Sequence, residues 1–286
     1  MAEQEHRQSG SASVDHVERA DPDGSIRSSI EIASVLKDPL ARSLLAALGA
    51  PADSLDRMLA ASDELRSLVT GYQRWAPLSQ IGWAITDLAT PQVYDQAAEL
   101  LDAGKQRTAE EVLEDYWNEP GRLESAALRV LRVAIYSETR IQVGQRRHEL
   151  VELAVADHRA ERYHASVPVA LAQAEGMVRD VIDSSPFLNP NRLSDDVSSS
   201  GHPDILQPIF ESSRATMKRT VLDVSGVFPP RHGVLHGRDL GYDNRRNSTK
   251  ALIALTELAT FCQAQLVRAE KDGTLEDLDR QAFGSA

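Results

Sequence analysis

The chain has 286 residues, of which 42% are hydrophobic and only 5% aromatic, and its formal net charge is −12 at pH 7. This length suits one large domain or two small ones. The acidic balance argues against a protein whose whole surface is covered by nucleic acid. Ala and Leu dominate the apolar residues, while Val and Ile rarely alternate with polar ones, so the composition favours an all-α protein.

The cysteine content and the N-terminus bear on the cellular compartment. The single cysteine, Cys262, excludes a disulfide within the chain, and the lack of a cysteine framework fits a reducing compartment. Cys262 falls on the apolar face of a predicted helix, where we expect a small core residue. No signal peptide is visible in the first residues, and no apolar run reaches the roughly 18 residues of a membrane span. We therefore expect a cytoplasmic protein that does not enter a membrane.

The first part of the chain is a polar segment followed by predicted helices. Residues 1–25 contain almost no large apolar side chains, so they are predicted to form a disordered tail. Apolar residues at helical spacing then predict helices over 26–48 and 53–69. Gly49 and Pro51 separate these two helices.

The following stretch, 71–90, has a less regular pattern and contains Trp75 and Trp83. Two interpretations are open: the tryptophans fill a core between helices, or they line a ligand site. Further helices are predicted at 91–101, 108–117 and 120–136. We expect these elements to form an N-terminal helical domain over residues 26–137.

The second half repeats the helical pattern around an irregular insert. Helices are predicted at 137–160, 162–182 and 203–221. The insert 184–203 is too rich in Pro, Ser, Asn and Asp for a helix, so it is predicted to be a functional or a disordered loop. We expect a second helical domain over 138–270, followed by a C-terminal tail, 271–286, with at most one short turn.

The stretch FPPRHGVLHGR, residues 228–238, cannot form an ordinary long helix. Its two prolines fix the backbone and remove two donors, and its two glycines weaken a helix. A capped helix is predicted to follow, with Asn247 or Ser248 as its N-cap. A polar turn mounted on a buried helix is a common place for function. The basic side chains of the turn are Arg231, His232, His236 and Arg238.

The charges in this region suggest chemistry on a phosphate. A guanidinium such as that of Arg231 forks onto phosphate oxygens, and an imidazole such as that of His236 can give or take a proton near neutral pH. We expect both side chains to be exposed. Between residues 214 and 250 there are eight Lys and Arg against three Asp, which indicates an anionic ligand. The candidate substrate-binding residues are His232, Arg238, Tyr242, Arg245, Arg246 and Asn247.

The string RHGVLHG, followed by Tyr242 and NSTKAL, resembles the C-terminal part of HEPN-superfamily proteins that are found near abortive-infection and toxin systems. Nuclease members of that superfamily carry an R-x4-6-H motif, and here Arg231 and His236 give R-x4-H. The string RYHASVPVALAQAEGMVRDVI is also similar to the helix that precedes the motif. Position 232 departs from the pattern, because His232 stands where Asn is frequent.

The resemblance implies a HEPN-like helical bundle in the C-terminal half and a metal-independent endoribonuclease. Arg231 and His236 would be catalytic, no cofactor would be needed, and the protein would be a toxin or antiphage effector with RNA as substrate and an antitoxin as a possible partner. One histidine cannot conveniently act as acid and base on opposite sides of one phosphate. A homodimer that brings two motifs together would solve this, and the resemblance implies such pairing.

Other interpretations of these residues remain open. The turn could belong to a non-catalytic helical module that binds RNA, a nucleotide or a protein, or it could be only a tight connection. His232 and His236 have the i, i+4 spacing of helix-borne metal ligands, but no third ligand is near them in the sequence. Glu175, on an otherwise apolar helix, could orient Arg231, meet a substrate or make a buried structural hydrogen bond. His158 is expected at a surface or a helix flank.

Overall fold

The computed structural model describes residues 63–134, 137–182, 209, 222 and 227–284, with 63–70 and 134 described by their backbone alone. All regular secondary structure within these ranges is helical, as the composition predicts. The predicted tail, the helix at 26–48, the insert at 184–203 and nearly all of the helix at 203–221 lie outside the described residues. The elements are α4 (Asp63–Gln80), α5 (Pro91–Asp102), α6 (Gln106–Asn118), α7 (Arg122–Ala127), the 3₁₀ helix η1 (Leu128–Ala134), α8 (Glu138–Arg159), α9 (Tyr163–Ile182), α12 (Arg231–Leu235), α13 (Arg245–Lys271) and α14 (Leu275–Phe283).

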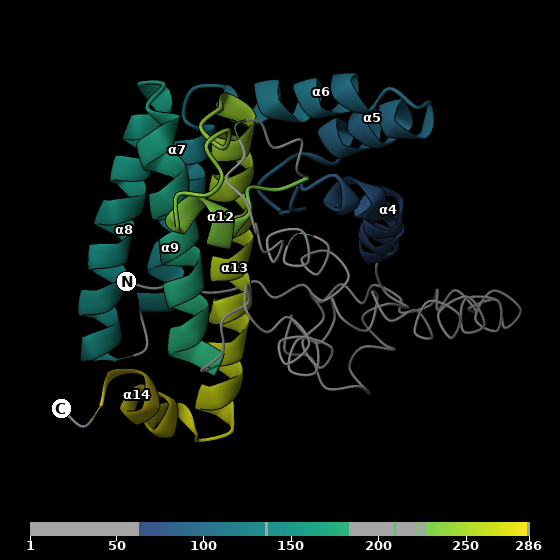
Figure 1. Ribbon diagram of the computed structural model, residues 1–286. Coiled ribbons are helices and arrows are strands. Elements are labelled where there is room, and N and C mark those ends of the chain that lie inside the picture. The colour runs from purple at the N-terminus through teal and green to yellow at the C-terminus, as the bar shows by residue number, and fades with distance from the viewer. Residues whose placement is uncertain (1–62, 135–136, 183–208, 210–221, 223–226, 285–286) are drawn as a thin grey trace, which may run out of the picture.

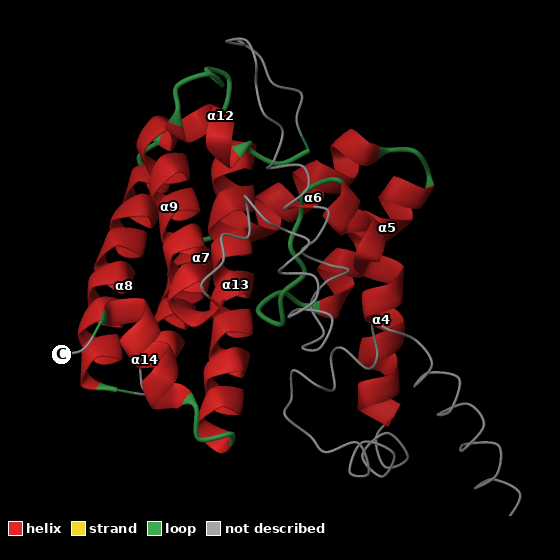
Figure 2. Cartoon of the chain, turned by 60° about the horizontal axis from the view of Figure 1, so that its bottom comes forward, coloured by secondary structure: helices red, strands yellow, loops and turns green. Residues whose placement is uncertain are grey.

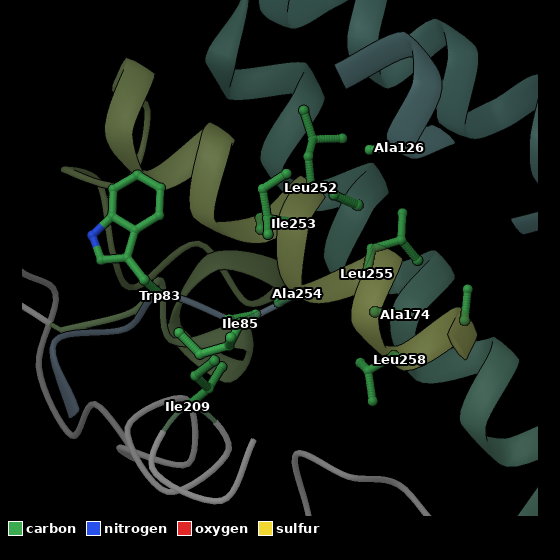
Figure 3. Packing of buried hydrophobic residues seen from close by; sticks show 14 of the residues in the cluster. Trp83, Ile85, Ala126, Ala174, Ile209, Leu252, Ile253, Ala254, Leu255 and Leu258 are labelled. Carbon is green, nitrogen blue, oxygen red and sulfur yellow. The ribbon is translucent and has the colours of Figure 1, made fainter. Parts of the chain in front are cut away.

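Helix α13 lies at the centre of the fold. It is 27 residues long, and its apolar residues point in all directions, which is typical of a helix covered on every side. Figure 1 shows α8, α9 and α7 on one side of α13 and α4, α5 and α6 on the other. In Figure 3, Leu252 and Leu255 of α13 lie toward Ala126 and Ala174, whereas Ile253 and Ala254 lie toward Trp83, Ile85 and Ile209.

The predicted helix at 53–69 is described from residue 63 as α4, and it ends later than the sequence pattern predicts. It continues through residues 71–80, which we expected to be irregular, and contains Pro77 in its last turn. Burial of Trp75 and Leu78 favours this continuation despite the proline. Trp75 packs on Tyr94 with 5.2 Å between ring centroids, and its indole donates to Asp95 at 2.9 Å. Trp75 and Trp83 are both buried, so their interpretation as core residues is confirmed.

Most other predicted helices are present with small shifts. The segment 120–136 divides into α7 and η1, and the predicted C-terminal turn is the nine-residue helix α14, which crosses the ends of α9 and α13 (Figure 2). The predicted caps of α13 are wrong. Asn244 is the N-cap, and its side chain accepts from the backbone N–H of Asn247 at 2.9 Å. The buried apolar cluster extends from Tyr72 to Leu266, across the predicted domain boundary at residue 137.

None of the helices in the described ranges combines the length and the apolar character that crossing a membrane would require.

Candidate functional site

The motif forms one short helical turn with Arg231 and His236 at its two ends. Pro230 is the N-cap of α12, Arg231 is its first residue, and His236 is its C-cap. A proline fits this position because its fixed φ is compatible with a helix start and no donor is lost there. The backbone N–H groups of Val234 and His236 donate to Pro230 and His232, at 2.9 and 3.1 Å.

Gly237 ends the turn and directs the chain toward α13. Its φ of +64° lies in the left-handed region, which a side chain disfavours. The N–H of Gly237 donates to the carbonyl of Val234 at 3.1 Å, and that of Arg238 to Gly233 at 2.7 Å. This pair of bonds is the Schellman arrangement. The glycine therefore fixes where the exposed imidazole of His236 is placed.

The guanidinium of Arg231 is paired with the carboxylate of Glu175, which lies within α9. The two side chains are 19% and 7% exposed, so the expectation that Arg231 is exposed is wrong. Opposite charges attract strongly when little water surrounds them. Of the interpretations of Glu175, the one in which it orients Arg231 is the one that the structure supports.

The two histidines of the turn are in contact. The ring centroids of His232 and His236 are 4.4 Å apart and the rings are tilted by 51°. His236 is exposed, as the sequence predicts, and His232 is half-buried. Among the described residues, no three His, Cys, Asp or Glu side chains form a group that could hold a metal ion. The two imidazoles are thus a local pair next to the Arg231–Glu175 ion pair.

The remaining candidate residues lie on the chain between α12 and α13. Arg238 is exposed. The hydroxyl of Tyr242 donates to the carbonyl of His164 at 3.1 Å, and burial, followed by nearby Asp243 and Asp239, raises the pKa of Tyr242. Asn247 is buried, and its amide donates to the carbonyl of Tyr242 at 3.1 Å. Tyr242 and Asn247 thus both make bonds that hold this connection.

Arg245 and Arg246, at the start of α13, form ion pairs with acidic residues of α6. Arg246 contacts Glu110 at 3.1 Å and Glu114 at 3.0 Å, and both carboxylates belong to α6. Arg245 lies 3.4 Å from Asp115 and 3.6 Å from Glu114. The structure brings these two arginines to α6, whereas it brings Arg231 to α9.

A buried lysine, which sequence reasoning missed, connects three segments behind the turn. Nζ of Lys250 donates to the carbonyl of Ile81 at 2.7 Å, to Glu110 at 2.7 Å and to the carbonyl of Val227 at 2.9 Å. Its burial lowers the pKa of Lys250, and Glu110 opposes that shift. The sequence signal for its burial was a lysine among the apolar residues of the helix that follows the motif. It holds the chain just before the two prolines.

His158 also differs from its prediction, because it is buried rather than on the surface. Its Nε2 lies 2.6 Å from Oδ1 of Asn118, and its Nδ1 lies 2.8 Å from the hydroxyl of Ser248. The Asn118 amide donates to Thr249 at 3.0 Å, so Oδ1 of Asn118 accepts from Nε2–H. Burial lowers the pKa of His158 to about 4. Ser248 is fully buried, so this serine and histidine serve the packing of α8 on α13.

No family model, curated protein or solved structure matches the chain. The short motif and the helix before it remain the source of the HEPN resemblance.

Proposed function

We propose that the protein is a metal-independent endoribonuclease of the HEPN type, acting as a toxin or antiphage effector, in which Arg231 and His236 are catalytic. The observation that carries the proposal is the arrangement of α12. An arginine oriented by Glu175 and an exposed imidazole lie at the two ends of a single helical turn. That combination provides a fixed positive charge and a proton-transfer group, which cleavage of an RNA phosphodiester requires.

The reaction would be a transfer within the RNA strand. The imidazole of His236 takes the proton of the 2′-hydroxyl, and the 2′-oxygen forms a bond to phosphorus. The bond from phosphorus to the 5′-oxygen breaks, and that oxygen receives a proton. The guanidinium of Arg231 stabilises charge on the phosphoryl oxygens; it has five N–H donors, so pairing with Glu175 does not use all of them.

The second proton transfer favours a homodimer. His232 and His236 lie side by side, with their ring centroids 4.4 Å apart, so both would approach a phosphate from the same side. The leaving 5′-oxygen is opposite the attacking 2′-oxygen and needs a group on the other side. A second copy of the turn, related by a two-fold axis, would supply it. Light scattering should then give twice the 31.4 kDa mass of the chain, and a monomer at micromolar concentration would contradict a shared site.

Product analysis tests the chemistry. A labelled single-stranded RNA should be cleaved equally well with and without EDTA, because the proposed groups are all side chains of the protein. The fragments should carry 2′,3′-cyclic phosphate ends, since the neighbouring hydroxyl is the nucleophile. Linear 5′-phosphate ends, or activity abolished by EDTA, would contradict this mechanism.

A second candidate is a non-catalytic helical module that binds RNA, a nucleotide or a protein such as an antitoxin through the same turn. The low exposure of Arg231 and the ion pairs of Arg245 and Arg246 favour it. RNA binding without any cleavage by the full chain would support this module over the enzyme.

A further inference from the structure

The N-terminal end of α13 faces a row of carboxylates on α6. Glu110, Glu114 and Asp115 make four contacts of 3.0–3.6 Å with Arg245 and Arg246. Acidic side chains of α6 therefore form ion pairs with two arginines that are candidate substrate-binding residues.

The contacts of Arg245 and Arg246 differ from a permanent buried ion pair. The side chain of Arg245 is 43% exposed and that of Arg246 is 30% exposed, and Asp115 is largely in water, whereas Glu114 and Glu110 are 12% and 10% exposed. The Arg245–Asp115 pair lies in water, where an ion pair contributes little to stability and is screened by salt, and both arginines keep an exposed part of the guanidinium side chain. Phosphate groups can therefore compete with the carboxylates for these arginines.

A buried contact beside them keeps α6 close to the turn. Lys250 and Glu110 are almost fully buried and 2.7 Å apart, and Lys250 also binds the carbonyl of Val227, next to the Phe-Pro-Pro entry to α12. The exposed contact between Arg245 and Asp115 can thus open while this one persists. The α6 carboxylates would then remain close enough to close over the arginines again.

We infer that α6 is an electrostatic cover that reduces binding of RNA at the start of α13. Glu114 and Asp115 hold Arg245 and Arg246 in place of RNA phosphates, so that the proposed nuclease has low affinity until the carboxylates are displaced. This regulation rests on the proposed function, because it assumes an RNA substrate.

The test compares two charge-matched double variants. Glu114→Gln with Asp115→Asn removes two of the three carboxylate charges of the cover and leaves Glu110, whereas Glu111→Gln with Glu119→Gln removes the same charge from surface pairs with Arg107 and Arg122. Binding of a labelled single-stranded 2′-fluoro RNA, which lacks the nucleophile, is measured by fluorescence anisotropy at several salt concentrations. Circular dichroism verifies that both variants are folded.

We expect the E114Q/D115N variant to bind severalfold more tightly than the control variant. Each phosphate contact on a single strand contributes about 0.7 to the slope of log affinity against log salt. Because Arg246 keeps its contact with Glu110, release of Arg245 should steepen that slope by about 0.7. Adding Arg245→Gln and Arg246→Gln should remove the gain.

The outcomes separate this inference from the proposed function. Equal slopes in the two double variants, with RNA cleaved by the wild type, would overturn the cover alone. A steeper slope in E114Q/D115N without cleavage by the wild type would support the cover and overturn the catalytic proposal. No RNA binding by any variant would overturn both.

Discussion

The guanidinium of Arg231, the first residue of α12, is paired with the carboxylate of Glu175 in the middle of α9. The pair joins the motif to α9, and Glu175 precedes Arg231 by 56 positions in the sequence. Because both side chains are mostly shielded from water, the pair holds the position of the turn and also orients the arginine.

Loss of the carboxylate should therefore destabilise the protein. Glu175→Gln leaves Arg231 without its opposite charge, and breaking a buried pair in this way costs about 3 kcal/mol. Urea denaturation measures the change in the free energy of unfolding. Glu149→Gln is the matched control, since Glu149 pairs with Arg146 on the surface of α8, where such pairs contribute about 0–1 kcal/mol. Equal losses in both variants would show that Arg231 does not depend on Glu175.

The close approach of Gly82 to the carbonyl of Val227 gives a second prediction. A Cβ on Gly82 would lie 1.9 Å from the carbonyl oxygen of Val227, and the φ of Gly82 is +88°. Gly82→Ala should therefore lower the free energy of unfolding by more than about 2 kcal/mol, because backbone strain and a backbone clash add together. Gly104→Ala has the same kind of strain, with φ +72°, but meets no atom within 4 Å. Gly104→Ala should lower the free energy of unfolding by about 1 kcal/mol. Equal losses for the two variants in urea denaturation would contradict the close approach of Gly82 to Val227.

Regular elements were predictable where periodicity and end signals agree. Pro91 opens α5, Ser137 caps α8, and the apolar pattern of α9 continues to its end. The segment 71–80 was misjudged because tertiary burial of aromatic side chains outweighs the presence of Pro77. Local rules also placed the cap of α13 three or four residues late, since Asn244 precedes two arginines that are themselves helical.

The candidate site was predictable as a short turn, but its partners were not. The two prolines and two glycines predict a short turn, and the structure places Arg231 and His236 at the two ends of α12. The contacts of Arg246 with α6 and the burial of His158 depend on helices that are distant in the sequence. The amino-acid sequence shows where charged residues lie and how apolar residues repeat. It does not show which helices pack against each other.

The buried histidine predicts a dependence of stability on pH. The pKa of His158 in the folded state, about 4, is below the usual value of 6.5. Above pH 6.5 both folded and unfolded states are neutral at this position, so it adds no pH dependence. As the pH falls toward 4, the unfolded state binds the proton first, and stability falls by up to about 3 kcal/mol.

Urea denaturation at pH 7.5 and pH 5 measures this effect. His158→Gln should be less stable than the wild type at pH 7.5 but should lose less stability between the two pH values. His164→Gln is the control, because His164 is exposed. An identical pH dependence in wild type and His158→Gln would mean that other groups cause it.

The Arg231→Lys variant separates the role of the planar guanidinium group of Arg231 from the role of its positive charge. Arg231→Lys keeps a positive charge that can still pair with Glu175, but it cannot form two parallel bonds to a phosphate. We expect the helical circular dichroism to be retained and the RNA cleavage rate to fall by roughly 10²-fold. Full activity of Arg231→Lys would reduce the role of Arg231 to that of a structural cation.

The most direct measurement is the rate of RNA cleavage by His236→Ala. Because His236 is exposed at the C-cap of α12, its removal should leave the fold intact. Loss of proton transfer by a positioned side chain should lower the rate by about 10²- to 10⁴-fold, while His164→Ala cleaves like the wild type. Cleavage by His236→Ala at the wild-type rate would contradict the assignment of this turn as the active site.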